Sequence, residues 1–203
     1  MTRGRFITFE GIDGAGKSTQ IDRLQALLVE RGIEVVRTRE PGGTPLAEKI
    51  RALLLADDMC TMSETLLFFA ARAEHIAQVI EPALARGAWV LSDRFTDATY
   101  AYQVGGKAFD GAAVEVLERM VQGQLNPDKT VLFDIEPLVA AERLAKARAA
   151  DRFERESVDF FRRVREAYLD RARRNPERFF IVDAAQSPED VSRALLTEAQ
   201  GWL

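Results

Sequence analysis

The stretch FEGIDGAGKSTQ, residues 9–20, constrains the fold of this chain more than any other segment. A short apolar run enters a glycine-rich turn, which is followed by Lys17, Ser18 and a helical pattern. The turn matches G-x-x-x-x-G-K-[ST] in full, and it has the strand-before, helix-after context that this motif requires. Glycines let consecutive backbone N–H groups cradle phosphate oxygens, and the helix N-terminus adds a positive dipole end. We therefore predict that residues 11–18 hold the phosphates of a nucleoside triphosphate.

Each part of this loop has an expected role. Lys17 is expected to reach the β- and γ-phosphates of the nucleotide, and the Ser18 hydroxyl to ligate Mg²⁺. The alternative is a glycine-rich turn that holds nothing, and the agreement of motif and context weighs against it. The residues predicted to bind the nucleoside triphosphate are Gly11, Ile12, Asp13, Gly14, Ala15, Gly16, Lys17, Ser18 and Thr19.

Apolar runs alternate with helical patterns along the rest of the chain, which indicates an α/β fold. With 203 residues and 47% hydrophobic content, one domain over 1–203 is expected, since two would each be small. The strands are apolar along most of their length, so a parallel sheet between two helix layers is predicted. Ligands in such sheets bind beyond the carboxyl ends of the strands. Strands are predicted at 5–10, 33–38, 88–93, 130–134 and 179–183.

Helical spacing and end signals define the remaining elements. Gly32 is expected to stop the first helix, and Ser63 is expected to cap the longest one. Helices are predicted at 17–31, 46–55, 63–86, 96–102, 111–122, 137–147, 157–174 and 188–202.

Charge and composition exclude several classes of protein. The net charge of −4 argues against nucleic acid or an anionic membrane as a partner. The chain has one cysteine, Cys60, which rules out an internal disulfide and fits a reducing compartment. No secretory h-region and no apolar run of membrane-spanning length is present, so neither a signal peptide nor a membrane helix is expected. The single histidine, His75, is interpreted as an ordinary helix residue.

Two classes of nucleotide-binding protein compete for this loop: a phosphotransferase with a second substrate, and a nucleotide-driven switch whose acceptor is water. A GTPase needs a late N-K-x-D, and residues 126–129 read NPDK instead. A transporter ATPase would carry an LSGGQ-like stretch, which is absent. Arginines at strand ends and on facing helices favour the phosphotransferase.

The chain resembles the bacterial thymidylate (dTMP) kinases over nearly its whole length. REPGGT followed by DRF and AYQ at these distances is more specific than the phosphate loop alone. The resemblance implies a P-loop NTPase fold with a five-stranded parallel sheet, helices on both faces and a short mobile lid at about 143–155. It implies γ-phosphoryl transfer from ATP to dTMP with Mg²⁺, towards dTTP, in a cytoplasmic homodimer. The matching stretches are FEGIDGAGKST (9–19), TREPGGTPLAEKIR (38–51), LLFFAAR (66–72), DRFTDATYAYQ (93–103) and DRFERE (151–156).

The same resemblance implies an acceptor site that includes the helix at 63–86. Phe68 would stack on thymine, and Arg72, four residues later, would donate to the base. Phe68 as a plain core residue and Arg51 as a solvated one remain open alternatives. The implied dTMP contacts are Arg39 and Arg51 near the phosphate, Asp13 at the sugar 3′-hydroxyl, Phe68, Arg72, Thr99 and Gln103 at the base, Tyr102 near the sugar, and Arg94.

The resemblance also implies catalytic roles for Lys17, Arg94, Asp93 and a lid arginine. Asp93 would organise Mg²⁺ and its waters, and Arg94 would clamp the donor and acceptor phosphates. Relatives place an arginine either inside the phosphate loop or in the lid, and this loop has Ala15. Arg148 is therefore predicted as the lid arginine.

The lid stretch KARAADR (146–152) lacks the glycine that many relatives have before DR, so Arg143 and Arg152 remain candidates for the catalytic arginine. Relatives commonly read YQGGGRG where this chain has YQVGGKAF, which leaves Lys107 without a role. A solvated charged helix is the alternative to a lid. A kinase for another nucleotide or a deoxynucleoside, or a nucleotide-binding switch or scaffold, also remains open.

Overall fold

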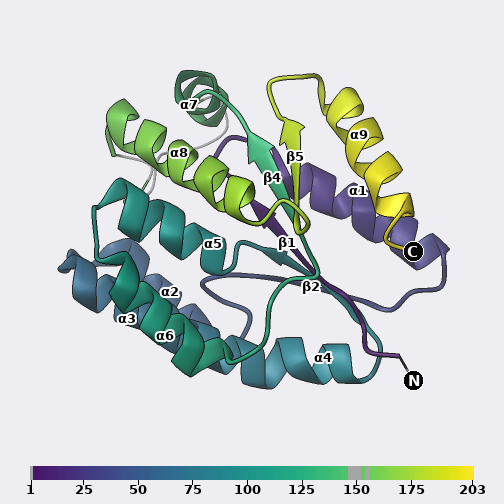
Figure 1. Ribbon diagram of the computed structural model, residues 1–203, viewed down its shortest axis with the longest axis horizontal. Helices are drawn as coiled ribbons and strands as arrows, with labels where there is room; N and C mark the ends of the chain where they lie inside the picture. The colour runs from purple at the N-terminus through teal and green to yellow at the C-terminus, as the bar shows by residue number, and fades with distance from the viewer. Residues whose placement is uncertain (1, 146–151, 154–155) are drawn as a thin grey trace.

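A five-stranded parallel sheet lies at the centre of the structure, a computed structural model that describes residues 2–145, 152–153 and 156–203 (Figure 1). The strand order is β2-β3-β1-β4-β5, and every residue of the central strand β1 is buried. The predicted parallel sheet is confirmed. The second strand begins at Val35, two residues later than predicted. It forms one edge of the sheet and is only partly buried. The strands are β1 (Phe6–Glu10), β2 (Val35–Arg39), β3 (Trp89–Asp93), β4 (Lys129–Asp134) and β5 (Phe179–Asp183).

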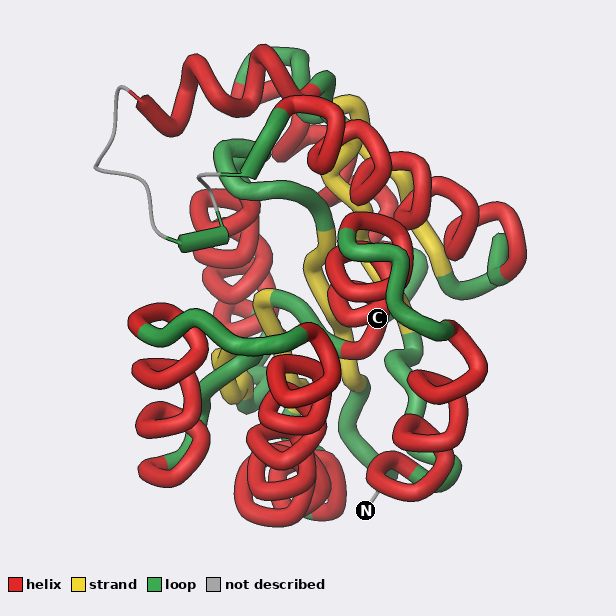
Figure 2. Tube along the Cα trace, turned by 90° about the vertical axis from the view of Figure 1, so that its left-hand side faces the viewer, coloured by secondary structure: helices red, strands yellow, loops and turns green. Residues whose placement is uncertain are grey.

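Helices cover both faces of the sheet (Figures 1 and 2). Helices α1 (Lys17–Glu30) and α9 (Pro188–Gln200) pack against each other on one face. The other face carries α8 (Val158–Arg174) and the segment that ends in α4 (Glu81–Ala85). The remaining described helices are α2 (Pro45–Ala56), α3 (Thr61–His75), α5 (Thr96–Thr99), α6 (Gly111–Gln122) and α7 (Pro137–Ala145). None of the helices in the described part of the chain has both the length and the apolar content that a membrane span requires.

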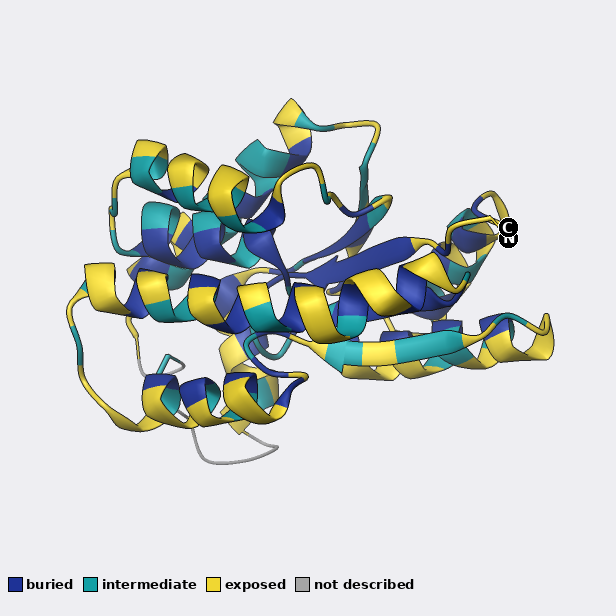
Figure 3. Cartoon of the chain, turned by 90° about the horizontal axis from the view of Figure 1, so that it is seen from below, coloured by how far each residue is buried: buried dark blue, intermediate teal, exposed yellow. Residues whose placement is uncertain are grey.

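The apolar stripe of α1 shows how sequence spacing creates the core. Ile21, Leu24 and Leu28 recur at helical spacing and are fully buried, while the outer helix faces stay exposed (Figure 3). Burying each such side chain contributes about 1.5–3 kcal/mol relative to leaving it exposed. This packing fixes the start of α1, and with it the phosphate loop, against the carboxyl end of β1.

The long helix predicted at 63–86 differs from the prediction in two ways. It begins at Thr61, so the cap predicted at Ser63 is wrong: Cys60 occupies the N-cap without a side-chain hydrogen bond. It also widens into a π-helix, η1 (Ile76–Ile80), before α4. Pro82, within the first turn of α4, has no N–H to donate to the preceding turn, which accounts for the altered hydrogen-bonding there.

A second π-helix follows α5 and extends the element predicted at 96–102. This segment, η2 (Tyr100–Gly106), buries Tyr102 and Gln103. π-Turns inside helices occur frequently at functional sites. Here the wider turn lies beside the carboxyl end of the sheet. The strand register aligns the ends of β1, β2 and β3 there, because Asp93 is the partner of both Phe9 and Arg39.

Candidate active site

The phosphate loop presents free backbone donors at the start of α1. Gly16 is the N-cap residue in the left-handed region (φ 88°), and no side chain caps the helix. The first N–H groups of α1 therefore have no side-chain acceptor, which is the arrangement that binds anions. Gly14 (φ 86°) also needs to be glycine, because a Cβ there would lie 2.3 Å from the Ala140 carbonyl oxygen.

Lys17 lies within this loop with only 5% of its surface exposed. Its Nζ donates to the carbonyl oxygens of Gly11 (3.0 Å) and Ile12 (3.3 Å). Burial, followed by the charge of Arg94, lowers the pKa of Lys17. The ammonium group is thus held against the loop by polar backbone groups, in position for phosphates bound by the same loop.

Asp93 and Arg94 leave strand β3 at the same edge. Asp93 Oδ1 is buried and has no hydrogen-bond partner among the described residues. Arg94 has a positive φ of 72°, stabilised by a bond from its N–H to the Phe9 carbonyl (3.0 Å) and one from the Ser92 hydroxyl to its carbonyl (2.8 Å). This sharp turn directs the Arg94 side chain across the sheet edge towards the phosphate loop.

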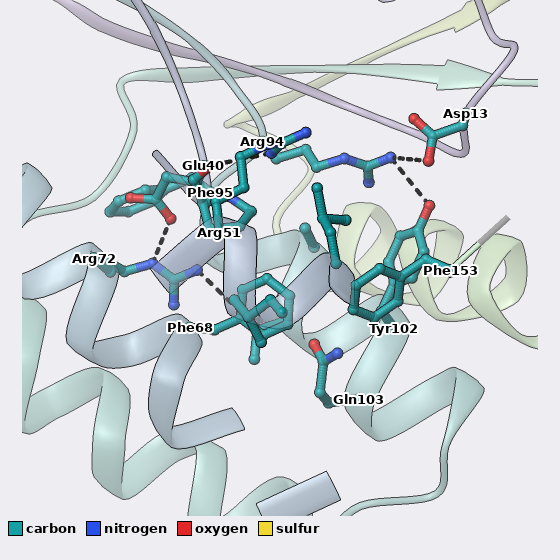
Figure 4. Close-up of a pocket in the computed structure, with 15 residues that line it drawn as sticks. Asp13, Glu40, Arg51, Phe68, Arg72, Arg94, Phe95, Tyr102, Gln103 and Phe153 are labelled. Carbon is teal, nitrogen blue, oxygen red and sulfur yellow. Dashed lines mark hydrogen bonds and ion pairs between the residues drawn. The ribbon is translucent and has the colours of Figure 1, made fainter. Parts of the chain in front are cut away.

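The Arg94 guanidinium lies between the phosphate loop and the neighbouring cavity (Figure 4). It donates to Asp13 Oδ2 (3.0 Å) and to the hydroxyls of Tyr102 (3.1 Å) and Tyr168 (3.1 Å). Burial opposes its charge, but the Asp13 carboxylate and the tyrosine hydroxyls raise the pKa of Arg94 above its usual value. Arg94 is therefore a permanent cation at the boundary of two sites.

An open pocket next to Arg94 spans about 700 Å³, part of which is continuous with solvent, and this is within the usual range for small-molecule sites. One wall comes from helices α2 and α3, another from the segment 94–103, and Asp13 closes the end nearest the phosphate loop. Phe68 is only partly buried and lies in the wall, so it is a lining residue as well as a packing residue. The lining residues are Asp13, Glu40, Pro41, Arg51, Leu54, Leu55, Phe68, Arg72, Arg94, Phe95, Ala98, Thr99, Tyr102, Gln103 and Phe153.

Arg72 is held in this wall by a buried ion pair. Its Nε donates to Glu40 Oε2 (2.7 Å), its Nη2 donates to the Thr99 hydroxyl (3.0 Å), and the rings of Phe69 and Phe95 lie 4.8 and 5.1 Å from its guanidinium carbon. Burial alone would raise the pKa of Glu40, but the charge of Arg72 holds this pKa below its usual value. One donor is left: Arg72 Nη1 is buried without a hydrogen-bond partner among the described residues.

His75 has a more definite place than an ordinary helix residue. Its Nδ1 lies 2.9 Å from Glu40 Oε1 and its Nε2 lies 2.6 Å from the Thr38 hydroxyl, with the ring fully buried. It therefore supports the carboxylate that fixes Arg72. Sequence reasoning missed this role, although Arg72 and His75 are three residues apart on one helix and so share a face.

The structure brings together all of the expected dTMP contacts except one. Arg51 lines the cavity and donates to the Pro41 carbonyl (3.1 Å). Arg39 is not among the described lining residues, and its half-exposed side chain donates to both oxygens of Glu48 (3.1 and 2.9 Å). The lining residues that sequence reasoning missed are Glu40, Pro41, Leu54, Leu55, Phe95, Ala98 and Phe153.

Two of the three candidate lid arginines have partners elsewhere. Arg143 donates to the carbonyls of Ala184 (2.7 Å) and Ala185 (3.1 Å). Arg152 donates to the Leu54 carbonyl (3.0 Å) in the cavity wall and pairs with Glu64 (3.1 Å). Arg148 lies outside the described residues.

Glu10, at the end of β1, is a buried acid behind Arg94. Its carboxyl group accepts from the Phe95 N–H (2.7 Å) and the Tyr168 hydroxyl (2.8 Å). Burial, followed by the charge of Asp97, raises the pKa of Glu10 to about 8. The folded protein therefore keeps a proton here that an unfolded chain would release near its ordinary value of 4.5.

Because the folded protein retains this proton, its free energy of unfolding should depend on pH. Between pH 4.5 and 8 the unfolded chain binds fewer protons at this group, so the Glu10 contribution should fall by up to about 1.4 kcal/mol per pH unit as the pH rises. Glu10→Gln removes this titrating group. The difference in free energy of unfolding between Glu10→Gln and the parent should therefore shift in favour of the variant as the pH rises. Urea titrations from pH 5 to 8 measure this, with the exposed Glu177→Gln as control. Parallel curves for parent and Glu10→Gln would contradict it.

Comparison with known proteins gives one consistent family. The thymidylate kinase family model matches residues 9–195. The chain is 57% identical over 194 residues to the thymidylate kinase of Methylobacillus flagellatus, covering 96% of both chains. It is 57% identical over 199 residues to that of Paraburkholderia xenovorans, covering 96% of this chain and 97% of the relative. The crystal structure of thymidylate kinase from Ehrlichia chaffeensis superposes with a TM-score of 0.79 at 34% identity, covering 98% of this chain and 99% of that one.

Proposed function

Because the chain belongs to the thymidylate kinase family, we propose that residues 11–19 hold ATP and that the cavity beside Arg94 holds dTMP. The enzyme transfers the γ-phosphoryl group of ATP to dTMP and releases dTDP and ADP. The positions of the two sites support this division, since Asp13 and Arg94 lie where the phosphate loop meets the cavity. Both substrates would then present their phosphates to the same guanidinium.

One observation carries the assignment of the base pocket: Arg72 Nη1 has no hydrogen-bond partner among the residues that the structure describes. A buried donor without an acceptor costs free energy, about 1–3 kcal/mol, unless a ligand supplies the acceptor. The 4-carbonyl of thymine is such an acceptor. Phe68, Thr99 and Gln103 line the same cavity and offer a ring face and polar groups to the base.

An acceptor panel tests this proposal. ADP release should be fast with dTMP, slower with dUMP, and weak with dCMP, AMP and deoxythymidine, measured with Mg²⁺ and saturating ATP. The first two bases have the 4-carbonyl, and deoxythymidine lacks the phosphate that Arg94 would hold. Equal rates with dTMP and AMP would place the base pocket elsewhere.

We propose that positive charge performs most of the catalysis. In phosphoryl transfer the transition state spreads charge over the transferring oxygens, so positioning and charge stabilisation dominate. Lys17 and Arg94 occupy suitable places, and Arg148 is proposed as the third cation. Arg143 and Arg152 are already engaged, with the Ala184 carbonyl and with Glu64 respectively, which supports this choice. The dTMP phosphate is itself the nucleophile, so no general base is required.

We propose Mg²⁺ as the metal, held by Ser18 and Asp93. The fit rests on Asp93 Oδ1, a buried carboxylate oxygen with no partner among the described residues. The described residues contain no group of three or more His, Cys, Asp or Glu side chains that could hold a metal. That suits Mg²⁺, which binds through one or two protein ligands together with phosphates and water. When bound, the ion would neutralise charge on the β- and γ-phosphates.

We propose that the chain forms a homodimer through α3 and α6. These helices pack against each other, and their outer faces expose large apolar side chains. Residues 62, 66, 70, 73 and 77 of the α3–η1 segment share one exposed face, and all of them are Met, Leu or Ala. Such a face is self-complementary across a twofold axis. The large exposed residues are Met62, Leu66, Val116 and Met120.

A charge on this face should separate the proposed dimer. Met120→Glu places a carboxylate at a side chain that is 75% exposed in the single chain, so the fold should persist while association weakens by tenfold or more, about 1.4 kcal/mol. Sedimentation equilibrium measures the mass of parent and variant. Val29→Glu on α1 is the matched control, because Val29 is also exposed (56%) but lies on another helix. A parent that sediments as a single chain would contradict the proposal.

We further propose a single kinase domain and a cytoplasmic location. The continuous sheet, in which all five strands take part, supports one domain. A reducing compartment suits Cys60, an exposed free thiol.

A further inference from the structure

Glu64, in the first turn of α3, is a fully buried carboxylate that the reaction as described so far does not use. It accepts from Gln103 Nε2 (3.0 Å) and from Lys107 Nζ (2.8 and 2.7 Å), and it pairs with Arg152 Nη1 (3.1 Å). We call these four residues the Glu64 cluster. It includes Lys107, for which sequence reasoning found no role, and it adjoins the acceptor cavity through Gln103.

The cluster fixes the orientation of the Gln103 amide. An ionised carboxylate only accepts hydrogen bonds, so the NH₂ group of Gln103 must face Glu64. The amide oxygen is then left for the cavity that Gln103 lines, and in Figure 4 it turns towards the side of Phe68. A neutral glutamine at position 64 could accept or donate, and it would allow either orientation of the Gln103 amide.

This orientation matters because pyrimidines differ at N3. Thymine and uracil carry an N3–H, which donates, whereas the N3 of cytosine accepts. A Gln103 amide oxygen facing the base pairs with the first pattern and leaves two acceptors opposed in the second. A site built for one hydrogen-bond pattern rejects the other because its polar groups go unpaired.

We propose that Glu64 is a positioning residue for base selection: it holds the Gln103 amide oxygen towards the base, so that the site accepts an N3–H. This inference rests on the proposed placement of dTMP in the cavity. Lys107 and Arg152 compensate the buried charge, which would otherwise be costly to keep in the interior. Glu64 itself does not line the cavity that the structure describes.

Glu64→Gln tests the inference, because it removes the forced orientation with little change in volume. We expect the ratio of kcat/KM for dTMP over dCMP to fall by about tenfold, the effect of one hydrogen bond. The change should arise from a higher KM for dTMP and a lower KM for dCMP, as the amide becomes free to turn. The measurement is ADP release with both monophosphates in parent and variant.

Lys107→Met is the matched control. It removes a partner of Glu64 but leaves the bond between Glu64 and Gln103, so the substrate ratio should stay within threefold of the parent's. If Glu64→Gln does not fold because its cations are left unpaired, the double variant Glu64→Gln/Lys107→Met removes one cation as well. The same fall of about tenfold is expected in that protein.

The outcomes separate this inference from the proposed function. Equal losses for dTMP and dCMP in Glu64→Gln would show that Glu64 only supports the fold, and would overturn the inference. An unchanged ratio in a folded variant would also overturn it, while leaving the base pocket in place. A parent enzyme without any preference for dTMP over dCMP would overturn the placement of the base, and the inference with it.

Discussion

Lys17→Ala should lower kcat by roughly 10³-fold, because a cation that stabilises the transferring phosphoryl group is lost from the phosphate loop. The KM for dTMP should change little, since Lys17 contacts the loop of the ATP site rather than the acceptor cavity. Steady-state kinetics with both substrates varied measures this.

The variants must separate charge from packing, because Lys17 is buried. Lys17→Met keeps most of the side-chain volume and should be as inactive as Lys17→Ala, with thermal unfolding close to the parent's. Lys49→Ala, at an exposed position on α2, is the control and should keep its activity. Near-normal turnover in folded Lys17→Met would remove Lys17 from the mechanism.

Arg72→Ala should lower the ratio of kcat/KM for dTMP over dCMP by roughly 10²-fold, within the range of about 10⁴ that hydrogen-bond recognition can reach. In the proposed base pocket, the Arg72 Nη1 donor would pair with the 4-carbonyl of thymine but oppose the amino group of cytosine. Removing it therefore takes away an attraction and a repulsion together. Because uracil has the same 4-carbonyl, dUMP should lose activity in parallel with dTMP. Kinetics with the three monophosphates measures the ratios.

A second variant is needed because Arg72→Ala leaves Glu40 in the interior without its cation. The double variant Arg72→Ala/Glu40→Gln removes that charge, so it should be more stable than Arg72→Ala while showing the same loss of base preference. If the dTMP to dCMP ratio stays at the parent's value in this folded double variant, Arg72 does not read the base.

Sequence reasoning was strongest where local chemistry decides the structure. The phosphate loop, the parallel strands and the stripe Ile21, Leu24 and Leu28 follow from spacing within short segments. Eight of the nine expected dTMP contacts line one cavity, although they come from four separate stretches. Their grouping was expected from the family resemblance, since spacing alone does not show which strand ends meet, and their contact with dTMP stays a prediction.

The misses share a physical cause: they depend on contacts between segments far apart in the chain. His75 supports Glu40 from another element, 35 residues away. Phe153 approaches Phe68 from a segment 85 residues later, with ring centroids 6.1 Å apart. The π-helical turns after His75 and Thr99 likewise have no periodicity that a helical pattern would reveal.

The positive φ of Arg94 has a consequence for any effort to make this protein more heat-resistant. A side chain in the left-handed region costs about 1 kcal/mol or more relative to glycine, because its Cβ atom crowds the neighbouring carbonyl oxygen. The hydrogen bonds from the guanidinium to Asp13, Tyr102 and Tyr168 offset part of this cost. In the proposed site, the same bend that strains the chain would aim a cation at both substrates. A library screened for melting temperature should hold position 94 fixed, because a substitution that relieves the backbone strain there would also remove the proposed clamp on the two substrates.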